Sequence, residues 1–173
     1  DIKIINIARF TDQKDHITLL KGFQKISQKY NCKLVIIGYG SNKKLIDNYI
    51  KTNKLQKKVK VIGFQLNPYK YINKSDLLIL SSIYEGLPNV ILEAITLKKF
   101  VISANCPTGP QEILNNGKYG YLFKPTNHLD LANKLEKYIK NKNKTKIINQ
   151  AYKSLGRFDY KKNNDKYLKI IKS

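Results

Sequence analysis

Short blocks of apolar, mostly β-branched residues recur along the chain between polar and turn-forming segments. The blocks are Ile2 to Ala8, Lys33 to Ile37, Val59 to Ile62, Leu77 to Leu80 and Phe100 to Ser103. Blocks of this length are typical of buried strands. The segments between them place apolar residues at helical spacing, as in Ile17, Leu20 and Phe23. Alternating strands and helices predict a parallel sheet with helices on both faces, that is, a three-layer α/β/α domain.

The last third of the chain is predominantly helical. Residues 120–123 predict one more short strand, and helices are expected over Leu129 to Lys140, Lys142 to Leu155 and Tyr160 to Lys172. The final segment is rich in lysine and can pack on this domain, on a partner domain or on a membrane surface. A length of 173 residues favours a single domain with one sizeable core.

Glycine and proline follow several of the predicted strands. Gly38 and Gly40 come after the second, Gly63 after the third, and residues 85–88 (Glu-Gly-Leu-Pro) after the fourth. Ligands of open α/β sheets bind at the carboxyl ends of the strands, where these loops lie. A Gly-x-Gly without a third glycine is not a dinucleotide fingerprint, so Gly38-Tyr39-Gly40 predicts a turn bordering the cleft.

The chain is strongly basic, with 33 Lys and Arg against 12 Asp and Glu and a formal charge of +21. Nucleic acid, an anionic membrane and phosphorylated ligands all fit such an excess, and so does a genome of biased composition. No apolar run is long enough to span a bilayer. Cys32 and Cys106 lack neighbours at metal-ligand spacing, which favours a reducing cytoplasm.

Two carboxylates, Glu85 and Glu93, stand eight residues apart around a Gly/Pro turn. A helix starting near Asn89 would place Glu93 one turn further on the same face. The free amides of Asn89 and Val90 would then form a phosphate site, and Glu93 could accept hydrogen bonds from two adjacent hydroxyls of a ribose. The alternative is an acidic residue favoured near a helix N-terminus, after an ordinary turn.

The spacing from Glu85 to Glu93, with its Glu-Gly-x-Pro opening, resembles the E-x7-E motif of the retaining GT-B glycosyltransferases of family four. In that family a Gly/Ala-Arg-Leu/Phe strand end is followed five residues later by Lys. Here Arg9, within Ala8-Arg9-Phe10, is followed by Lys14. The resemblance implies a Rossmann-like domain in which Arg9 and Lys14 bind the donor diphosphate, in place of a metal ion.

The resemblance also assigns the other donor contacts. Glu93 would bind the ribose, and Glu85 with the amides of Gly86 and Leu87 would face the sugar. Gly63-Phe64 would hold the base through backbone groups, which favours uracil. The expected cofactor-binding residues are Gly63, Phe64, Gly86, Leu87, Asn89, Val90 and Glu93. No Asp-x-Asp pair is present, so no metal requirement is expected.

The segment from Asn105 to Ile113 resembles that of family members that build lipopolysaccharide and capsule, which implies a UDP-linked hexose or N-acetylhexosamine donor. The resemblance covers the C-terminal half of a GT-B enzyme. A preceding Rossmann-like domain would supply the site for a glycan or lipid-linked acceptor, so this part alone is expected to be inactive. The opening at Asp1 without methionine agrees with that expectation.

In the full enzyme we expect transfer with retention, in the cytoplasm, at the inner face of an anionic cytoplasmic membrane. A GT-B-like sugar-nucleotide epimerase is the main alternative. A basic nucleic-acid-binding module is a weaker one, because no nucleic-acid motif is recognisable. Of the two histidines, His128 is expected at a helix start, and His16 belongs to a Gln-Lys-x-His variant of the Lys14 motif.

Overall fold

The computed structural model describes residues 1–159, so the helix predicted over Tyr160 to Lys172 lies outside the described residues. The described part contains one six-stranded sheet, in the order β3-β2-β1-β4-β5-β6, with every neighbouring pair parallel. The strands are β1 (Ile2–Ile7), β2 (Cys32–Ile37), β3 (Val59–Ile62), β4 (Leu77–Leu80), β5 (Phe100–Ala104) and β6 (Tyr121–Phe123). The outermost strands are therefore β3, with four residues, and β6, with three.

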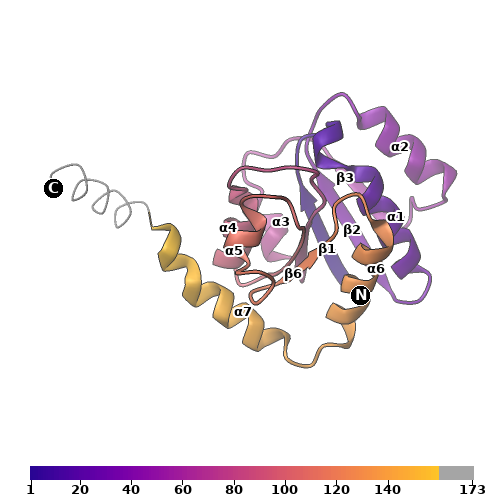
Figure 1. Cartoon of the computed structure of the whole chain (residues 1–173). Coiled ribbons are helices and arrows are strands. Elements are labelled where there is room, and N and C mark those ends of the chain that lie inside the picture. The colour runs from indigo at the N-terminus through magenta and orange to yellow at the C-terminus, as the bar shows by residue number, and fades with distance from the viewer. Residues whose placement is uncertain (160–173) are drawn as a thin grey trace, which may run out of the picture.

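Helices cover both faces of the sheet (Figure 1). One layer consists of α1 (His16–Ser27), α2 (Lys43–Thr52) and α6 (His128–Lys140). The other consists of α3 (Tyr69–Asn73), α4 (Asn89–Thr96) and α5 (Pro110–Ile113), and α7 (Lys144–Lys153) packs against α4. Two 3-10 turns complete the chain, η1 (Asp12–Lys14) and η2 (Ser154–Phe158). The three-layer α/β/α prediction is confirmed.

Two hydrophobic clusters form the core, one on each face of the sheet. Successive strand residues point to opposite faces, so Ile4 and Leu34 join the cluster under α1 and α6. Their neighbours Ile5 and Val35 join the cluster under α4 and α5. Because every residue of β4 is buried, this strand forms the centre of the domain. The strand order reverses between β1 and β4. Open sheets of this class bind ligands beside the carboxyl ends of the two strands at this point.

Several element boundaries differ from the sequence prediction. The first strand ends at Ile7 rather than Ala8, although the Ala8 N–H still donates to the carbonyl of Ile37 on β2 at 3.1 Å. The helix predicted over residues 142–155 spans only Lys144–Lys153, and a 3-10 turn follows it. Helix α6 begins at His128, one residue before the predicted range and with this histidine at the helix start as expected, and the Asn127 side chain accepts from the amide of Asp130.

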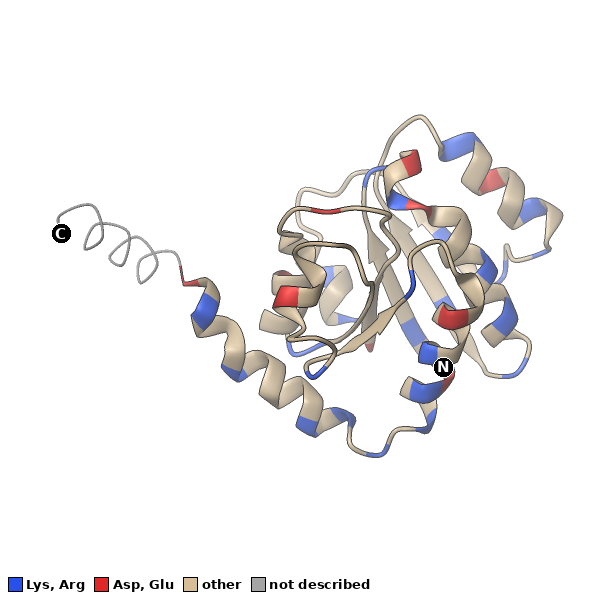
Figure 2. Cartoon of the chain, in the orientation of Figure 1, with Lys and Arg blue, Asp and Glu red and all other residues tan. Residues whose placement is uncertain are grey.

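Basic residues are distributed over both helical layers (Figure 2). Lysines occur on α1, α2 and α6 on one face and on α3 and α7 on the other, whereas α4 has none. None of the described helices is long and apolar enough to cross a membrane. The charge therefore does not by itself mark one binding face.

Candidate donor-binding site

The loops after β1 and β2 are joined by backbone contacts. The Phe10 N–H donates to the carbonyl of Tyr39 at 2.7 Å. A Cβ at Gly38 would lie 1.9 Å from the Ala8 carbonyl oxygen, and one at Gly40, where φ is +147°, would lie 2.5 Å from the Phe10 carbonyl oxygen. Only glycine permits this approach. The Gly-x-Gly after β2 is thus a turn that fixes the loop carrying Arg9.

A cavity of about 370 Å³ opens beside these loops at the carboxyl edge of the sheet. Four residues predicted from the sequence line it: Arg9, Phe64, Val90 and Glu93. The sequence did not single out the remaining lining residues, Ile7, Ala8, Ile37, Gly38, Tyr39, Gln65 and Pro68, as ligand contacts. The cavity therefore brings together a cation, a carboxylate and an aromatic wall from four separate segments of the chain.

The aromatic wall is formed by Tyr39 and Phe64. Their rings meet edge to face at 5.9 Å, and both are more than half exposed. The Gln65 side chain donates to the carbonyl of Phe64 at 3.0 Å and accepts from the Tyr71 hydroxyl at 3.0 Å, which holds the strand-end turn. A planar base could stack here, because aromatic rings prefer offset or edge-to-face contacts with other π systems.

Glu93 lies in the second turn of α4, four residues after Asn89, where the sequence predicted it. Partial burial raises the pKa of its carboxyl above the usual value. Within residues 1–159 this carboxylate has neither an ion pair nor a hydrogen-bond donor. The N-cap residue, Pro88, offers no side-chain cap, and its carbonyl accepts from the amide of Ile91, so the amides of Asn89 and Val90 in the first turn of α4 remain open to a ligand.

Lys14 and Glu85 form an ion pair 71 residues apart in sequence. The Lys14 Nζ lies 2.6 Å from the Glu85 Oε1, with side chains 17% and 9% exposed. The Ser82 hydroxyl donates to the same oxygen at 2.6 Å, and the Ser81 hydroxyl donates to the Lys14 carbonyl at 2.8 Å. Two predicted site residues therefore meet directly, a contact that the sequence motifs did not predict.

The loop after β5 braces the turn that contains Glu85. Thr108 donates from its hydroxyl to the Glu85 carbonyl at 2.5 Å. Gly109, at φ +70°, packs so closely that a Cβ would lie 1.8 Å from the Gly86 oxygen and 2.7 Å from Pro88. Gly86 itself faces open space, and the Leu87 side chain is half exposed. The amides predicted to meet the sugar thus lie on an accessible but supported turn.

Cys106 and His16 are both buried, and burial keeps each side chain uncharged near pH 7. The buried Cys106 thiol donates to the Ser82 carbonyl at 3.0 Å, and burial, assisted by the Glu85 charge, raises its pKa to about 11. His16 is buried against Phe10, and burial lowers its pKa to about 4. The thiol stays protonated and the imidazole neutral near pH 7, so both are structural.

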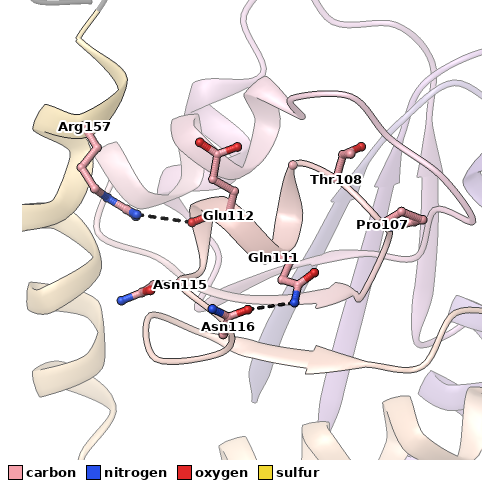
Figure 3. A pocket seen from close by; sticks show the side chains of 8 residues that line it. Pro107, Thr108, Gln111, Glu112, Asn115, Asn116 and Arg157 are labelled. Atoms are coloured by element: carbon pink, nitrogen blue, oxygen red, sulfur yellow. Dashed lines mark hydrogen bonds between the residues drawn. The ribbon is translucent and has the colours of Figure 1, made fainter.

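A second pocket, of about 410 Å³, lies beside α5 and is lined by polar side chains (Figure 3). Gln111 donates to the Asn116 side chain at 2.8 Å, and Arg157 donates to the carbonyls of Glu112 and Ile113 at 3.4 and 3.0 Å. None of the predicted donor contacts lines it.

Among residues 1–159 no three His, Cys, Asp or Glu side chains cluster closely enough to hold a metal ion. That donor binding requires no metal stays a prediction.

Comparison with known proteins identifies the family of the chain. The family model of the glycosyl transferases group 1 matches residues 1–155, which is most of the chain. The chain belongs to this family. The confirmed fold is also that of solved GT-B glycosyltransferases.

Curated relatives include an uncharacterized glycosyltransferase of Methanocaldococcus jannaschii, 41% identical over 70% of this chain and 33% of that protein. A 4-alpha-N-acetylgalactosaminyltransferase of Campylobacter jejuni, which acts on a diphospho-undecaprenol substrate, is 30% identical over 83% of this chain and 41% of its own length. The lipopolysaccharide 1,6-galactosyltransferase of Escherichia coli is 31% identical over 76% and 37%. The chain thus spans about a third to two fifths of these relatives.

Two solved structures superpose closely. A mutant of Staphylococcus aureus TarM in complex with UDP gives a TM-score of 0.90 at 25% identity, covering 99% of this chain and 35% of that one. Anabaena HepE in complex with UDP gives 0.88 at 22% identity, covering 99% and 49%. The second similarity is one of fold alone.

Proposed function

We propose that this chain is the donor-binding domain of a retaining glycosyltransferase and that its cavity binds a UDP-linked hexose or N-acetylhexosamine. The main observation behind this proposal is the partly buried Glu93 carboxylate, which lines the same cavity as Arg9 and Phe64. Within residues 1–159 it has no hydrogen-bond or ion-pair partner. A buried acceptor without a donor is costly. Two adjacent ribose hydroxyls supply the donors it lacks.

The diphosphate would bind between the exposed Arg9 and the first-turn amides of α4, because both attract anions. Lys14 adds a third positive group. In the structure Lys14 is neutralised by Glu85. When the donor binds, Lys14 must therefore move toward the phosphates, and the hydroxyls of the donor sugar must form hydrogen bonds to Glu85 in its place. This exchange couples binding of the diphosphate to placement of the sugar.

In the full enzyme, sugar transfer breaks the bond between the anomeric carbon and the diphosphate oxygen. The acceptor hydroxyl would approach on the side from which the diphosphate leaves, forming the new glycosidic bond with retention and passing its proton to the diphosphate. Arg9 and Lys14 stabilise the charge that develops on the leaving group. Glu85 would orient the sugar and would not act as a nucleophile.

The relatives support the substrate class. TarM was solved with UDP, and the named E. coli and C. jejuni relatives transfer galactose and N-acetylgalactosamine. We therefore favour uracil as the base and a glycan or lipid-linked acceptor bound partly by a further domain. Cell-surface polysaccharide synthesis at the cytoplasmic face of a membrane is the corresponding role.

Calorimetric titration of the 173-residue chain with UDP and with GDP tests this proposal. We expect UDP to bind more tightly, and Glu93→Gln to weaken UDP binding about 10- to 100-fold, the worth of hydrogen bonds to a charged acceptor. Glu112→Gln makes the same chemical change on α5, away from the cavity, and should leave UDP binding unchanged. Absence of binding to either nucleotide, or equal affinities of parent and Glu93→Gln, would refute it.

A further inference from the structure

Two lysines stand side by side at the amino end of the sheet. Lys3 of β1 and Lys33 of β2 are register partners, and both side chains are exposed on the face that carries Ile5 and Val35. Like charges directly opposite each other destabilise a sheet. On β3 the register partner of Val35 is another exposed lysine, Lys60. Positive charge is thus concentrated on one face of three neighbouring strands, at a cost in stability.

These lysines border an apolar trough of about 570 Å³. Its floor includes Ile5, Val35 and Tyr71, and its rim includes the exposed Lys3, Lys33 and Lys74. The trough stays open because α3, which lies beside it, has only five residues and cannot cover the amino-terminal half of the strands. An apolar floor beneath a cationic rim is the result.

Two acidic residues lie near the trough without neutralising it. Asp1 is 3.4 Å from the Lys33 Nζ, in a pair with both side chains substantially exposed, which gives it little strength. Asp76 accepts a hydrogen bond from the backbone N–H of Lys3 at 2.7 Å rather than from its side chain. Lys3 and Lys74 form no ion pair within residues 1–159.

We propose that this lysine-rimmed trough binds anionic phospholipid and docks the chain on an anionic membrane surface. The lysines match the headgroup phosphates, and the floor matches the first segments of an acyl chain. A nucleic acid would leave the apolar floor unused, and so would free phosphate. The trough lies at the amino ends of the strands and the donor cavity at their carboxyl ends, so a ligand in one does not occupy the other.

Vesicle sedimentation tests the charged rim. The chain is incubated with phosphatidylcholine vesicles, with or without phosphatidylglycerol, and binding is expected only with the anionic lipid. The variant Lys3→Gln, Lys33→Gln, Lys74→Gln should bind on the order of a hundredfold more weakly, because each lysine near an anionic surface contributes about fivefold. Thermal unfolding followed by circular dichroism verifies that this variant folds.

The matched control is Lys21→Gln, Lys44→Gln, Lys51→Gln, which removes three exposed lysines of α1 and α2 on the opposite layer. Both variants lower the net charge equally. A larger loss in the trough variant supports the proposal. A loss no larger than that of the control overturns it, because binding would then depend on total charge alone.

The apolar floor is tested by fluorescence, since the chain has no tryptophan. Tyr71→Trp places one reporter in the trough. Its emission should shift to the blue on vesicles containing phosphatidylglycerol and stay unchanged with glycerol phosphate. An unshifted emission on those vesicles, or an equal shift with glycerol phosphate, overturns the proposal. Because Tyr71→Trp also removes the hydroxyl that donates to Gln65 beside the donor cavity, UDP titration of the same variant shows separately whether that cavity is affected.

Discussion

The burial of His16 makes the folded protein sensitive to mild acid. The side chain is 3% exposed, its ring meets the Phe10 ring edge to face at 5.2 Å, and neither ring nitrogen has a hydrogen-bond partner within residues 1–159. Desolvation lowers its pKa from 6.5 to about 4, with smaller opposing effects from Asp15 and Lys14.

The direction of the effect follows from proton binding. The unfolded chain binds a proton at His16 below about pH 6.5, whereas the folded chain does not do so until about pH 4. Stability therefore rises with pH across this window and falls as the pH is lowered through it. Lowering the pH from 7 to 5 should remove about 2 kcal/mol of unfolding free energy through this residue, at about 1.4 kcal/mol per pH unit below the unfolded pKa.

His16→Leu tests this expectation, because leucine has a similar volume and needs no hydrogen bonds. Urea unfolding followed by circular dichroism at pH 7 and pH 5 gives the free energies. The parent should lose about 2 kcal/mol more than the variant between the two values. His128→Gln, at the start of α6, removes the other histidine and should retain the loss seen in the parent. Equal losses in the parent and His16→Leu would refute the reasoning.

Further predictions concern the site. Gly109→Ala should destabilise the fold by about 2 kcal/mol or more through its positive φ and its contact with Gly86, and calorimetry should show weaker binding of UDP-sugar. Lys14→Met should cost about 2 kcal/mol in urea unfolding, largely restored by adding Glu85→Gln, because the single change leaves a buried carboxylate unpaired; additive costs would contradict this. Cys106 should resist iodoacetamide until the chain unfolds, as mass spectrometry can follow. Chelation by EDTA should leave UDP affinity unchanged; a loss would indicate a metal.

Local patterns predicted the fold well. The bounds of β3 and β4 match the apolar blocks, and α4 begins at Asn89 as its turn residues indicate. These features depend on neighbours in sequence: apolar blocks, turn chemistry and helical spacing. The short α3 and α5 have too few residues to show a period.

Local sequence patterns could not predict the contacts between segments that are distant in sequence. The motif resemblance assigned Lys14 and Glu85 separately, yet their ion pair depends on how two loops meet at the sheet edge. The burial of His16 depends likewise on Phe10 and the α1 packing. Nothing in the sequence from Asn105 to Ile113 marks Gly109, whereas in the structure its lack of a side chain allows close packing against the turn that contains Gly86. A positive φ or a close approach has no signature within one short segment.

The two edge strands of the sheet limit how copies of this domain can associate. A strand at the border of a sheet exposes unpaired N–H and C=O groups that can recruit another chain. Here β3 and β6 form the borders, with four and three residues, and a lysine interrupts β3. Few backbone groups are therefore available for edge-to-edge pairing between copies. Protein partners of this domain should therefore not bind by extending the sheet, and sequence changes that lengthen β3 or β6 carry the greatest risk of aggregation.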